Sequence, residues 1–368
     1  MKKTGYFYDD TMCLHRKRDG QHPECPERIT SIHKYLYEKG LLDKCVHFDS
    51  RLASEEEVLD IHTLTYLSKL KNLKSLNDEQ LDKLQVRYNS IYLNNDSYDC
   101  ALKSAGCVTE LTKQVLIGTC HHGIAVVRPP GHHAESDEAM GFCLLNNVAI
   151  AANMARRKFK TKRIVILDWD IHHGNATQHQ FYETNEVLYL SLHKYNHGKF
   201  YPGGKDGHSK KIGYGKGEGY NVNIAWNANH LDDNAYVLAF DSIIIPILES
   251  YKPELILISA GFDCADGDHL GDAHITPIGF QYMTHKLVSL MKNIGQDGKI
   301  VMALEGGYNL NSISISMAAC LEVLTGYIPK EYNKSFFVLK EDDGVRNSLR
   351  ETKDNLLKYW PILHNSVI

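Results

Sequence analysis

The 368-residue sequence lacks the features that mark membrane, secreted and nucleic-acid-binding proteins. No stretch approaches the roughly 20 consecutive apolar residues that a helix needs to span a bilayer. The segment Met1–His15 has two lysines but no apolar run after them, so it does not resemble a signal peptide. The formal net charge of -4 leaves no basic surplus of the kind that binds duplex nucleic acid. We expect an intracellular protein, cytoplasmic or, in a eukaryote, nuclear, with neither a membrane nor a nucleic-acid partner.

Paired cysteines and linkers are also missing. The nine cysteines include no CxxC pair, which fits a reducing compartment. No Ser/Gly/Pro-rich linker and no internal repeat divides the chain, and the hydrophobic content of 43% is typical of a globular protein with a substantial core. We predict a single domain over residues 1–368, with a motif-bearing core at about 4–330 and a helical tail at 345–368. The sequence leaves the oligomeric state open.

From about Gly123 onward, short β-branched runs alternate with amphipathic stretches at helical spacing. This alternation predicts an α/β fold with a central parallel sheet flanked by helices on both faces. The expected strands are Gly123–Val127, Arg163–Asp168, Val187–Leu192, Gly219–Ala225, Glu254–Ala260 and Lys299–Leu304. The expected helices are Pro26–Lys39, Glu55–Leu70, Tyr98–Val115, Asn146–Phe159, Asn234–Ser250, Pro277–Asn293, Asn311–Leu324 and, in the tail, Val345–Trp360. The glycine- and lysine-rich segment Gly203–Gly219 is expected to form a flexible surface loop.

Ionisable side chains follow several predicted strands, at the edge where ligands bind in open α/β sheets. In the segment Asp168–His172, alternation along an extended chain points two carboxylates and an imidazole to one side. Together with Asp263, which follows another strand, such a set suits a catalytic zinc ion with an open position for water. The alternative is that these residues only cap the following helix.

Two further features stand at strand ends. His132 and His133 follow a Pro-Pro-Gly turn, where one imidazole could take a proton from water while the other pairs with a carboxylate such as Asp168. Tyr308 follows two glycines, so its hydroxyl could approach a substrate and donate to the oxyanion of a tetrahedral intermediate. The ordinary alternatives are a surface turn with chance histidines and a packed tyrosine.

Taken in order along the chain, these and further motifs resemble one family. The motifs are Arg-Pro-Pro-Gly-His-His-Ala at 128–134, Gly-Phe-Cys at 141–143, Leu-Asp-Trp-Asp-Ile-His-His-Gly-Asn at 167–175, Ser-Leu-His-Lys-Tyr at 191–195, Ser-Ala-Gly-Phe-Asp at 259–263 and Glu-Gly-Gly-Tyr at 305–308. With His-Pro-Glu-Cys-Pro-Glu-Arg at 22–28, the set resembles the zinc-dependent histone deacetylases. The residues within the motifs are more similar to those of class II and its bacterial amidohydrolase relatives than to those of class I. The resemblance implies the arginase/deacetylase fold and the hydrolysis of acyl-lysine amides.

The resemblance also implies roles for individual residues. The zinc ligands would be Asp170, His172 and Asp263. The catalytic groups would be His133 as general base, His132 as its electrostatic partner hydrogen-bonded to Asp168, and Tyr308 as oxyanion donor. The substrate-binding residues would be Ser90, Gly141, Phe142, Tyr201, Leu270 and Gly307. A structural potassium site would use Asp168, Asp170, His172, Ser191 and Leu192, and a second one Phe181, Thr184, Val187 and Tyr220.

Two positions bear on the substrate. Tyr201 stands where the resembled family usually has phenylalanine in the tunnel for the lysine stem, and Leu270 stands where polyamine deacetylases have glutamate. Leu270 favours an acylated lysine in a protein or peptide, while Asp266 and Asp268 keep an acetylated small amine, a polyamine, as the alternative. Two other interpretations are an arginase-like dinuclear manganese hydrolase and a non-catalytic protein that only binds acyl-lysine.

Overall fold

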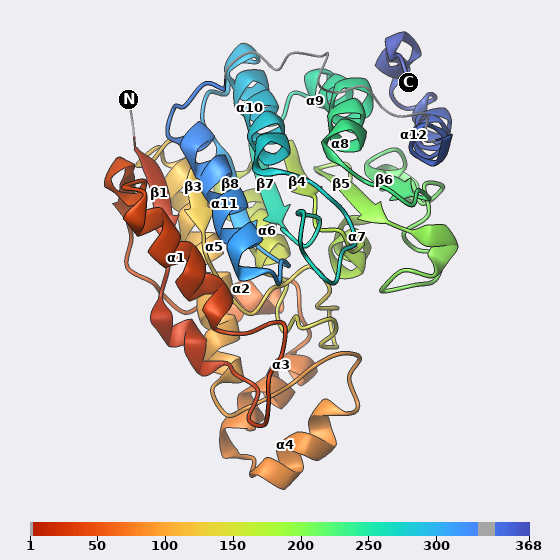
Figure 1. Cartoon of the computed structure of the whole chain (residues 1–368). Coiled ribbons are helices and arrows are strands. Elements are labelled where there is room, and N and C mark those ends of the chain that lie inside the picture. Colours follow the sequence, from red (N-terminus) through yellow and green to blue (C-terminus); the bar gives the residue numbers. More distant parts are fainter. Residues whose placement is uncertain (1–2, 330–342) are drawn as a thin grey trace.

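The computed structural model describes residues 3–329 and 343–368, and these contain one eight-stranded parallel sheet (Figure 1). In spatial order its strands are β2 (Cys45–His47), β1 (Thr4–Phe7), β3 (Gly123–Ala125), β8 (Ile300–Leu304), β7 (Leu255–Ala260), β4 (Ile164–Asp168), β5 (Val187–Lys194) and β6 (Asn221–Trp226). The central strands β8, β7 and β4 are buried along their whole length, as their Val/Ile/Leu runs require in a sheet covered on both faces. The predicted α/β architecture is confirmed.

All six predicted strands are present, but two strands at one edge of the sheet were missed. β1 and β2 have four and three residues, too few for a periodic pattern to distinguish them. A Cβ built on Gly5 would lie 2.7 Å from the Leu111 side chain, so glycine is what allows the helix that carries Leu111 to pack against β1. The first 120 residues, expected to be helical, therefore also extend the sheet.

Helices cover both faces of the sheet. One layer, in front in Figure 1, consists of α1 (Glu27–Glu38), α8 (Asp233–Ala239), α9 (Ile245–Tyr251), α10 (Pro277–Asn293) and α11 (Leu310–Leu324). The layer behind consists of α5 (Ser97–Leu116), α6 (Asn147–Phe159) and α7 (Asn175–Phe181). The predicted helix Asn234–Ser250 is in fact α8 and α9, which one turn of π-helix at Phe240–Ile244 separates.

Helix capping explains the remaining differences from the predicted helices. The predicted helix Glu55–Leu70 is two helices, α2 (Glu55–Leu59) and α3 (Leu64–Asn72), because Thr63 starts a new helix by accepting a hydrogen bond from Tyr66 N. A short helix that was not predicted, α4 (Asp78–Gln85), begins at a capping box formed by Asn77.

The predicted C-terminal helix is present as α12 (Asp343–Leu356) and packs beside β6. The Thr352 hydroxyl donates to the backbone oxygen of Asn223 on that strand. The segment Gly203–Gly219 forms a loop at the surface as predicted, and four buried side chains are hydrogen-bonded to its backbone. No helix in the described part of the chain is long and apolar enough to cross a membrane.

Candidate metal centre and tunnel

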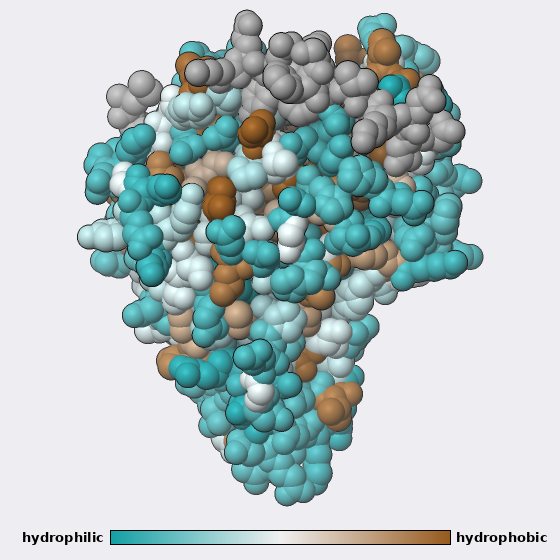
Figure 2. Space-filling view, viewed as in Figure 1, coloured by the Kyte–Doolittle hydropathy of each residue, from teal (hydrophilic) through white to brown (hydrophobic). Residues whose placement is uncertain are grey.

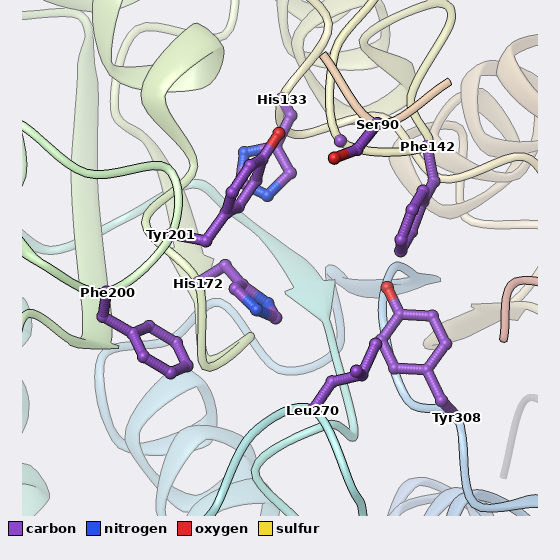
Figure 3. A pocket seen from close by; sticks show the side chains of 9 residues that line it. Ser90, His133, Phe142, His172, Phe200, Tyr201, Leu270 and Tyr308 are labelled. Carbon is purple, nitrogen blue, oxygen red and sulfur yellow. The ribbon is translucent and has the colours of Figure 1, made fainter. Parts of the chain in front are cut away.

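The sequence-predicted site residues meet at the carboxyl edge of the sheet, around a cavity of about 250 Å³ (Figure 3). Its lining consists of Ser90, His133, Gly141, Phe142, His172, Phe200, Tyr201, Leu270 and Tyr308. Five of the six predicted substrate-binding residues are among them. Gly307 is not, because its carbonyl oxygen faces the Arg28 guanidinium at 2.6 Å. Phe200 was missed, and it stacks on the His172 ring with centroids 5.2 Å apart.

Asp170, His172 and Asp263 form the candidate metal centre. The three offer one carboxylate oxygen, one imidazole nitrogen and a second carboxylate oxygen, all within 4.8 Å of one another. His172 Nδ1 lies 3.1 Å from Asp170 Oδ1 and 3.0 Å from Asp263 Oδ2. Burial opposes the charge on His172, but the two carboxylates outweigh burial and raise its pKa to about 10. Two buried carboxylates side by side need a nearby positive charge, which a divalent cation can supply. Two carboxylate oxygens and one imidazole nitrogen are also ligands that zinc prefers, so the residues fit zinc.

Backbone groups orient the two carboxylates. Asp170 accepts hydrogen bonds from Gly306 N and His172 N, both at 2.9 Å, and Asp263 accepts one from Ile171 N at 2.9 Å. A Cβ built on Gly306 would lie 2.2 Å from Asp263 Oδ2, so only glycine fits between the two acids. Burial and the neighbouring charge of Asp170 raise the pKa of Asp263 to about 7.

The histidine pair beside the metal centre is divided by its hydrogen-bond partners. His132 Nδ1 lies 3.0 Å from Asp168 Oδ2, as the resemblance implied, whereas His133 Nδ1 lies 2.7 Å from Asn175 Oδ1. Asn175 donates its Nδ2 to Glu135, so its Oδ1 must accept the His133 N–H. His133 Nε2 is then the unprotonated ring nitrogen.

The electrostatics of the pair agree with this assignment. Burial opposes the charge on His132, but Asp170 and Asp168 outweigh burial and raise the pKa of His132 well above its usual value. Burial and the nearby positive charge of His132 hold the pKa of His133 well below its usual value. The surroundings therefore favour the charged form of His132 and the neutral form of His133, which suits His133 to accept a proton.

Tyr308 lines the cavity on the side opposite His133 (Figure 3). Its hydroxyl points toward the Phe142 ring in Figure 3, and the two rings meet edge to face at 5.8 Å. The Asp268 carboxylate holds the turn, since it accepts hydrogen bonds from Tyr308 N at 2.5 Å, Asn309 N at 3.1 Å and Leu270 N at 2.9 Å. One buried carboxylate thus joins the tyrosine turn to the loop that carries Leu270.

Sequence reasoning missed a buried charge network behind Tyr308. Glu24 is fully buried and accepts hydrogen bonds from Arg128 Nε at 2.8 Å, Arg128 Nη2 at 2.6 Å and Arg28 Nη1 at 3.1 Å. Arg28 also lies 5.1 Å from the Tyr308 ring centre. All three charged residues stood within the quoted motifs, but no local pattern shows that they pair.

The two predicted potassium sites lie along β4, β5 and the loop before β5. For the first site, Asp168 and Ser191 are register partners on adjacent strands, and the Ser191 hydroxyl is 2.8 Å from His193 Nδ1. For the second, Thr184 N donates to Phe181 O, and Tyr220 O accepts from Tyr189 N. These contacts join only some members of each set, and both sites remain predictions.

Comparisons with known proteins point to one family. The model of the family described as "Histone deacetylase domain" matches residues 22–324. The chain is 44% identical to "Histone deacetylase 5" of Arabidopsis thaliana, over 98% of this chain and 54% of that protein. It is 42% identical to "Histone deacetylase HDA1" of Saccharomyces cerevisiae, over 89% of this chain and 49% of the relative. It is also 38% identical to "Polyamine deacetylase HDAC10" of Mus musculus, over 89% of this chain and 47% of the relative.

The chain spans about half the length of these curated relatives. Among solved structures, the "Crystal Structure of HDA15 HD domain" matches with a TM-score of 0.88 and 34% identity, over 99% of this chain and 96% of that one. The match confirms the predicted arginase/deacetylase fold.

Proposed function

The chain belongs to the histone deacetylase family, and on that premise we propose that it hydrolyses acyl-lysine amides of proteins or peptides with the help of zinc. One observation carries the proposal: His133, Tyr308 and His172 of the candidate metal centre line the same cavity of about 250 Å³. His132, which favours the charged form, lies beside that centre, with its Nε2 3.8 Å from Asp170 Oδ2. These are the groups that hydrolysis of an amide requires around one carbonyl carbon.

Asp170, His172 and Asp263 would hold the zinc ion, which when bound supplies a Lewis acid for the acyl carbonyl and lowers the pKa of water. His133 accepts the proton of the attacking water at Nε2, because Asn175 occupies its Nδ1. His132 stays charged beside Asp168 and stabilises the negative charge that develops nearby. The Tyr308 hydroxyl donates a hydrogen bond to the oxyanion.

The cavity walls favour a lysine side chain as the substrate stem. The rings of Phe142 and Tyr201, with the side chain of Leu270, provide apolar surface against which methylene groups pack. Potassium ions at the two predicted sites would support the neighbouring loops. The elemental analysis for zinc should therefore measure potassium as well.

The second candidate function is polyamine deacetylation, which the similarity to a relative named polyamine deacetylase favours. It needs a free carboxylate at the tunnel mouth to bind a second ammonium group. Asp268 is buried and accepts three backbone hydrogen bonds, Asp266 lies 2.8 Å from His274 Nδ1, and Asp272 lies 2.6 Å from Lys194 Nζ. Because these carboxylates already have partners and Leu270 lines the cavity, we favour the peptide substrate.

The two other interpretations fit less well. A dinuclear manganese hydrolase needs carboxylates that bridge two ions, yet the other metal-capable cluster among the described residues, His132, Cys143 and Glu305, shares no residue with the candidate metal centre. A protein that only binds acyl-lysine has no use for a tyrosine and a neutral histidine on opposite walls of the cavity.

The test is turnover of a substrate panel by the zinc-reconstituted protein: acetyl-lysine and longer-acyl peptides, N-acetylputrescine and N8-acetylspermidine. We expect kcat/KM for acetyl-lysine peptide to exceed that for either polyamine at least tenfold, that is by about 1.4 kcal/mol. Tyr308→Phe should lower kcat by about 100-fold, while the exposed control Tyr37→Phe should not. Faster polyamine turnover would favour the second candidate, and wild-type turnover by Tyr308→Phe would remove the tyrosine from the mechanism. Elemental analysis should find one zinc per chain.

A further inference from the structure

The segment between β5 and β6 carries a cluster of lysines, and the candidate catalytic site does not use its charge. Residues 199–217 contain five lysines and one aspartate, in a chain whose formal net charge is -4. In Figure 1 this segment forms the right-hand edge of the molecule, which Figure 2 shows as mostly hydrophilic. A local positive surplus in an otherwise acidic chain points to an anionic ligand.

The segment surrounds a concavity of about 620 Å³. We call it the basic concavity; its lining is Tyr195, His197, Gly198, Gly204, Lys205, His208, Lys210 and Lys211. No carboxylate is among these residues. Lys211 pairs with Asp206 at 3.2 Å, whereas the ammonium groups of Lys205 and Lys210 form no ion pair with any residue that the structure describes. Two lysines without an ion-pair partner among the described residues thus line the hollow, while the nearby Glu351 lies 3.8 Å from His208 Nε2 and Asp206 is paired with Lys211.

Buried polar side chains hold the backbone around the basic concavity. Gln178 Nε2 donates to Asp206 O at 2.9 Å, Asn221 Nδ2 to Lys211 O at 2.6 Å and Asn223 Nδ2 to His208 O at 3.3 Å. His193 Nε2 lies 2.7 Å from Gly207 O. All four donors are at most 2% exposed. The lysines therefore project from a backbone that is already ordered, which reduces the entropy lost when a ligand binds.

The same stretch of chain builds the tunnel wall. Phe200 and Tyr201 line the tunnel, while Gly198 and Gly204 on either side of them line the basic concavity and are joined by a 3.0 Å hydrogen bond from Gly204 N to Gly198 O. Lys205 is four residues from Tyr201, so their Cα atoms are at most about 14 Å apart. An extended peptide covers that distance in about four residues.

We propose that the basic concavity binds acidic or phosphorylated side chains that flank the acyl-lysine, and so selects substrate proteins. This inference rests on the proposed function, because it assumes a peptide in the tunnel. Carboxylate and phosphate groups share the chemistry that Lys205 and Lys210 would recognise. A nucleic-acid strand fits less well, because duplex binding requires many phosphate contacts along an extended basic surface, and the chain as a whole is acidic.

The experiment compares kcat/KM for two kinds of acetyl-lysine peptide. The acidic peptides carry Glu or phosphoserine two to five residues before or after the acetyl-lysine, and the matched neutral peptides carry Gln or Ser at the same position. Within each variant the readout is the ratio of acidic to neutral peptide, so the amount of folded enzyme cancels. We expect wild type to prefer the acidic and phosphorylated peptides by about 5- to 20-fold at low salt. The preference should shrink in 0.5 M salt, because salt screens exposed charges and the Debye length falls to about 4 Å.

Charge reversal assigns the effect to the basic concavity. Lys205→Glu and Lys210→Glu should each remove most of the preference. Lys216→Glu changes the charge of the same segment equally but lies outside the lining, and should keep the preference. Preference for Glu peptides alone or phosphoserine peptides alone would assign the site to that one anion.

Three results would overturn the inference. The first is equal kcat/KM for acidic and neutral peptides, which leaves the proposed function intact. The second is an equal loss of preference in Lys216→Glu, which would make the effect one of overall charge. The third is that a labelled single-stranded DNA of 20 nucleotides binds the protein through Lys205 and that no acidic peptide displaces it. Failure to hydrolyse any peptide would instead reject the proposed function, and this inference with it.

Discussion

Replacing Glu24 by glutamine should strongly destabilise the protein, although the substitution keeps the shape of the side chain. The Glu24 carboxylate and the guanidiniums of Arg28 and Arg128 are all 0% exposed. Burial alone would favour the neutral acid, but the charge of Arg128 outweighs burial and holds the pKa of Glu24 well below its usual value. Glu24→Gln would leave two buried guanidiniums without their carboxylate.

Removing one partner of a buried ion pair costs about 3–5 kcal/mol. That is a large part of the roughly 5–15 kcal/mol by which a native domain is stable. The assay is urea unfolding followed by the fluorescence of the buried Trp169 and Trp226. The control is Glu79→Gln, whose carboxylate pairs with Lys83 in a pair that is at least 70% exposed, and which should change the free energy of unfolding by less than about 1 kcal/mol.

The prediction also has a catalytic part. Arg28 donates to the carbonyl oxygens of Gly307 and Glu305 and faces the Tyr308 ring, so a displaced guanidinium should disturb the tyrosine turn and lower kcat more than it raises KM. A Glu24→Gln variant within about 1 kcal/mol of wild type would refute the reasoning, because the buried charges would then not depend on their pairing.

Three further predictions concern single residues. Asp268→Asn should lower kcat at least tenfold, because three backbone N–H groups, including that of Tyr308, lose their charged acceptor; Asp266→Asn, whose partner is the exposed His274, should not. Gly141→Ala should lower kcat/KM at least about tenfold, because its Cβ would lie 2.5 Å from His133 Cδ2, whereas Gly20→Ala, with a similar positive φ but open surroundings, should retain activity. Burial lowers the pKa of His62 to about 4, whereas a histidine in the unfolded chain has a pKa of about 6.5. Between about pH 4 and pH 6.5 the unfolded chain therefore binds more protons at this residue than the folded chain does. From pH 7 to pH 5 the contribution of His62 should lower the free energy of unfolding by about 2 kcal/mol. Urea unfolding of wild type and His62→Gln at both pH values checks this, and an equal fall in the two proteins would contradict it.

Local patterns were enough to predict six of the eight described strands and the family. The runs that became β4, β7 and β8 are apolar because both faces are covered, and this shows in consecutive residues. The strand-end rule likewise placed Asp170, His172 and Asp263 at one edge of the sheet, although β4 ends at Asp168 and the chain bends at residues 170–172, so alternation along an extended chain did not describe the segment. These features depend on neighbours in the chain, so they can be read without a structure.

The partners of these residues depended on the tertiary structure. Asn175 as the partner of His133, Asp268 as the anchor of Tyr308 and Glu24 as the partner of Arg128 are contacts between residues 40 or more positions apart, the last pair 104 apart. The basic concavity is similar, since composition showed the lysines and only packing showed that they surround a hollow. Residue type and spacing determine which side chains can stand at the end of a strand. Which distant side chain satisfies a buried charge or donor is decided by how the layers pack, because that choice depends on geometry that no short segment contains.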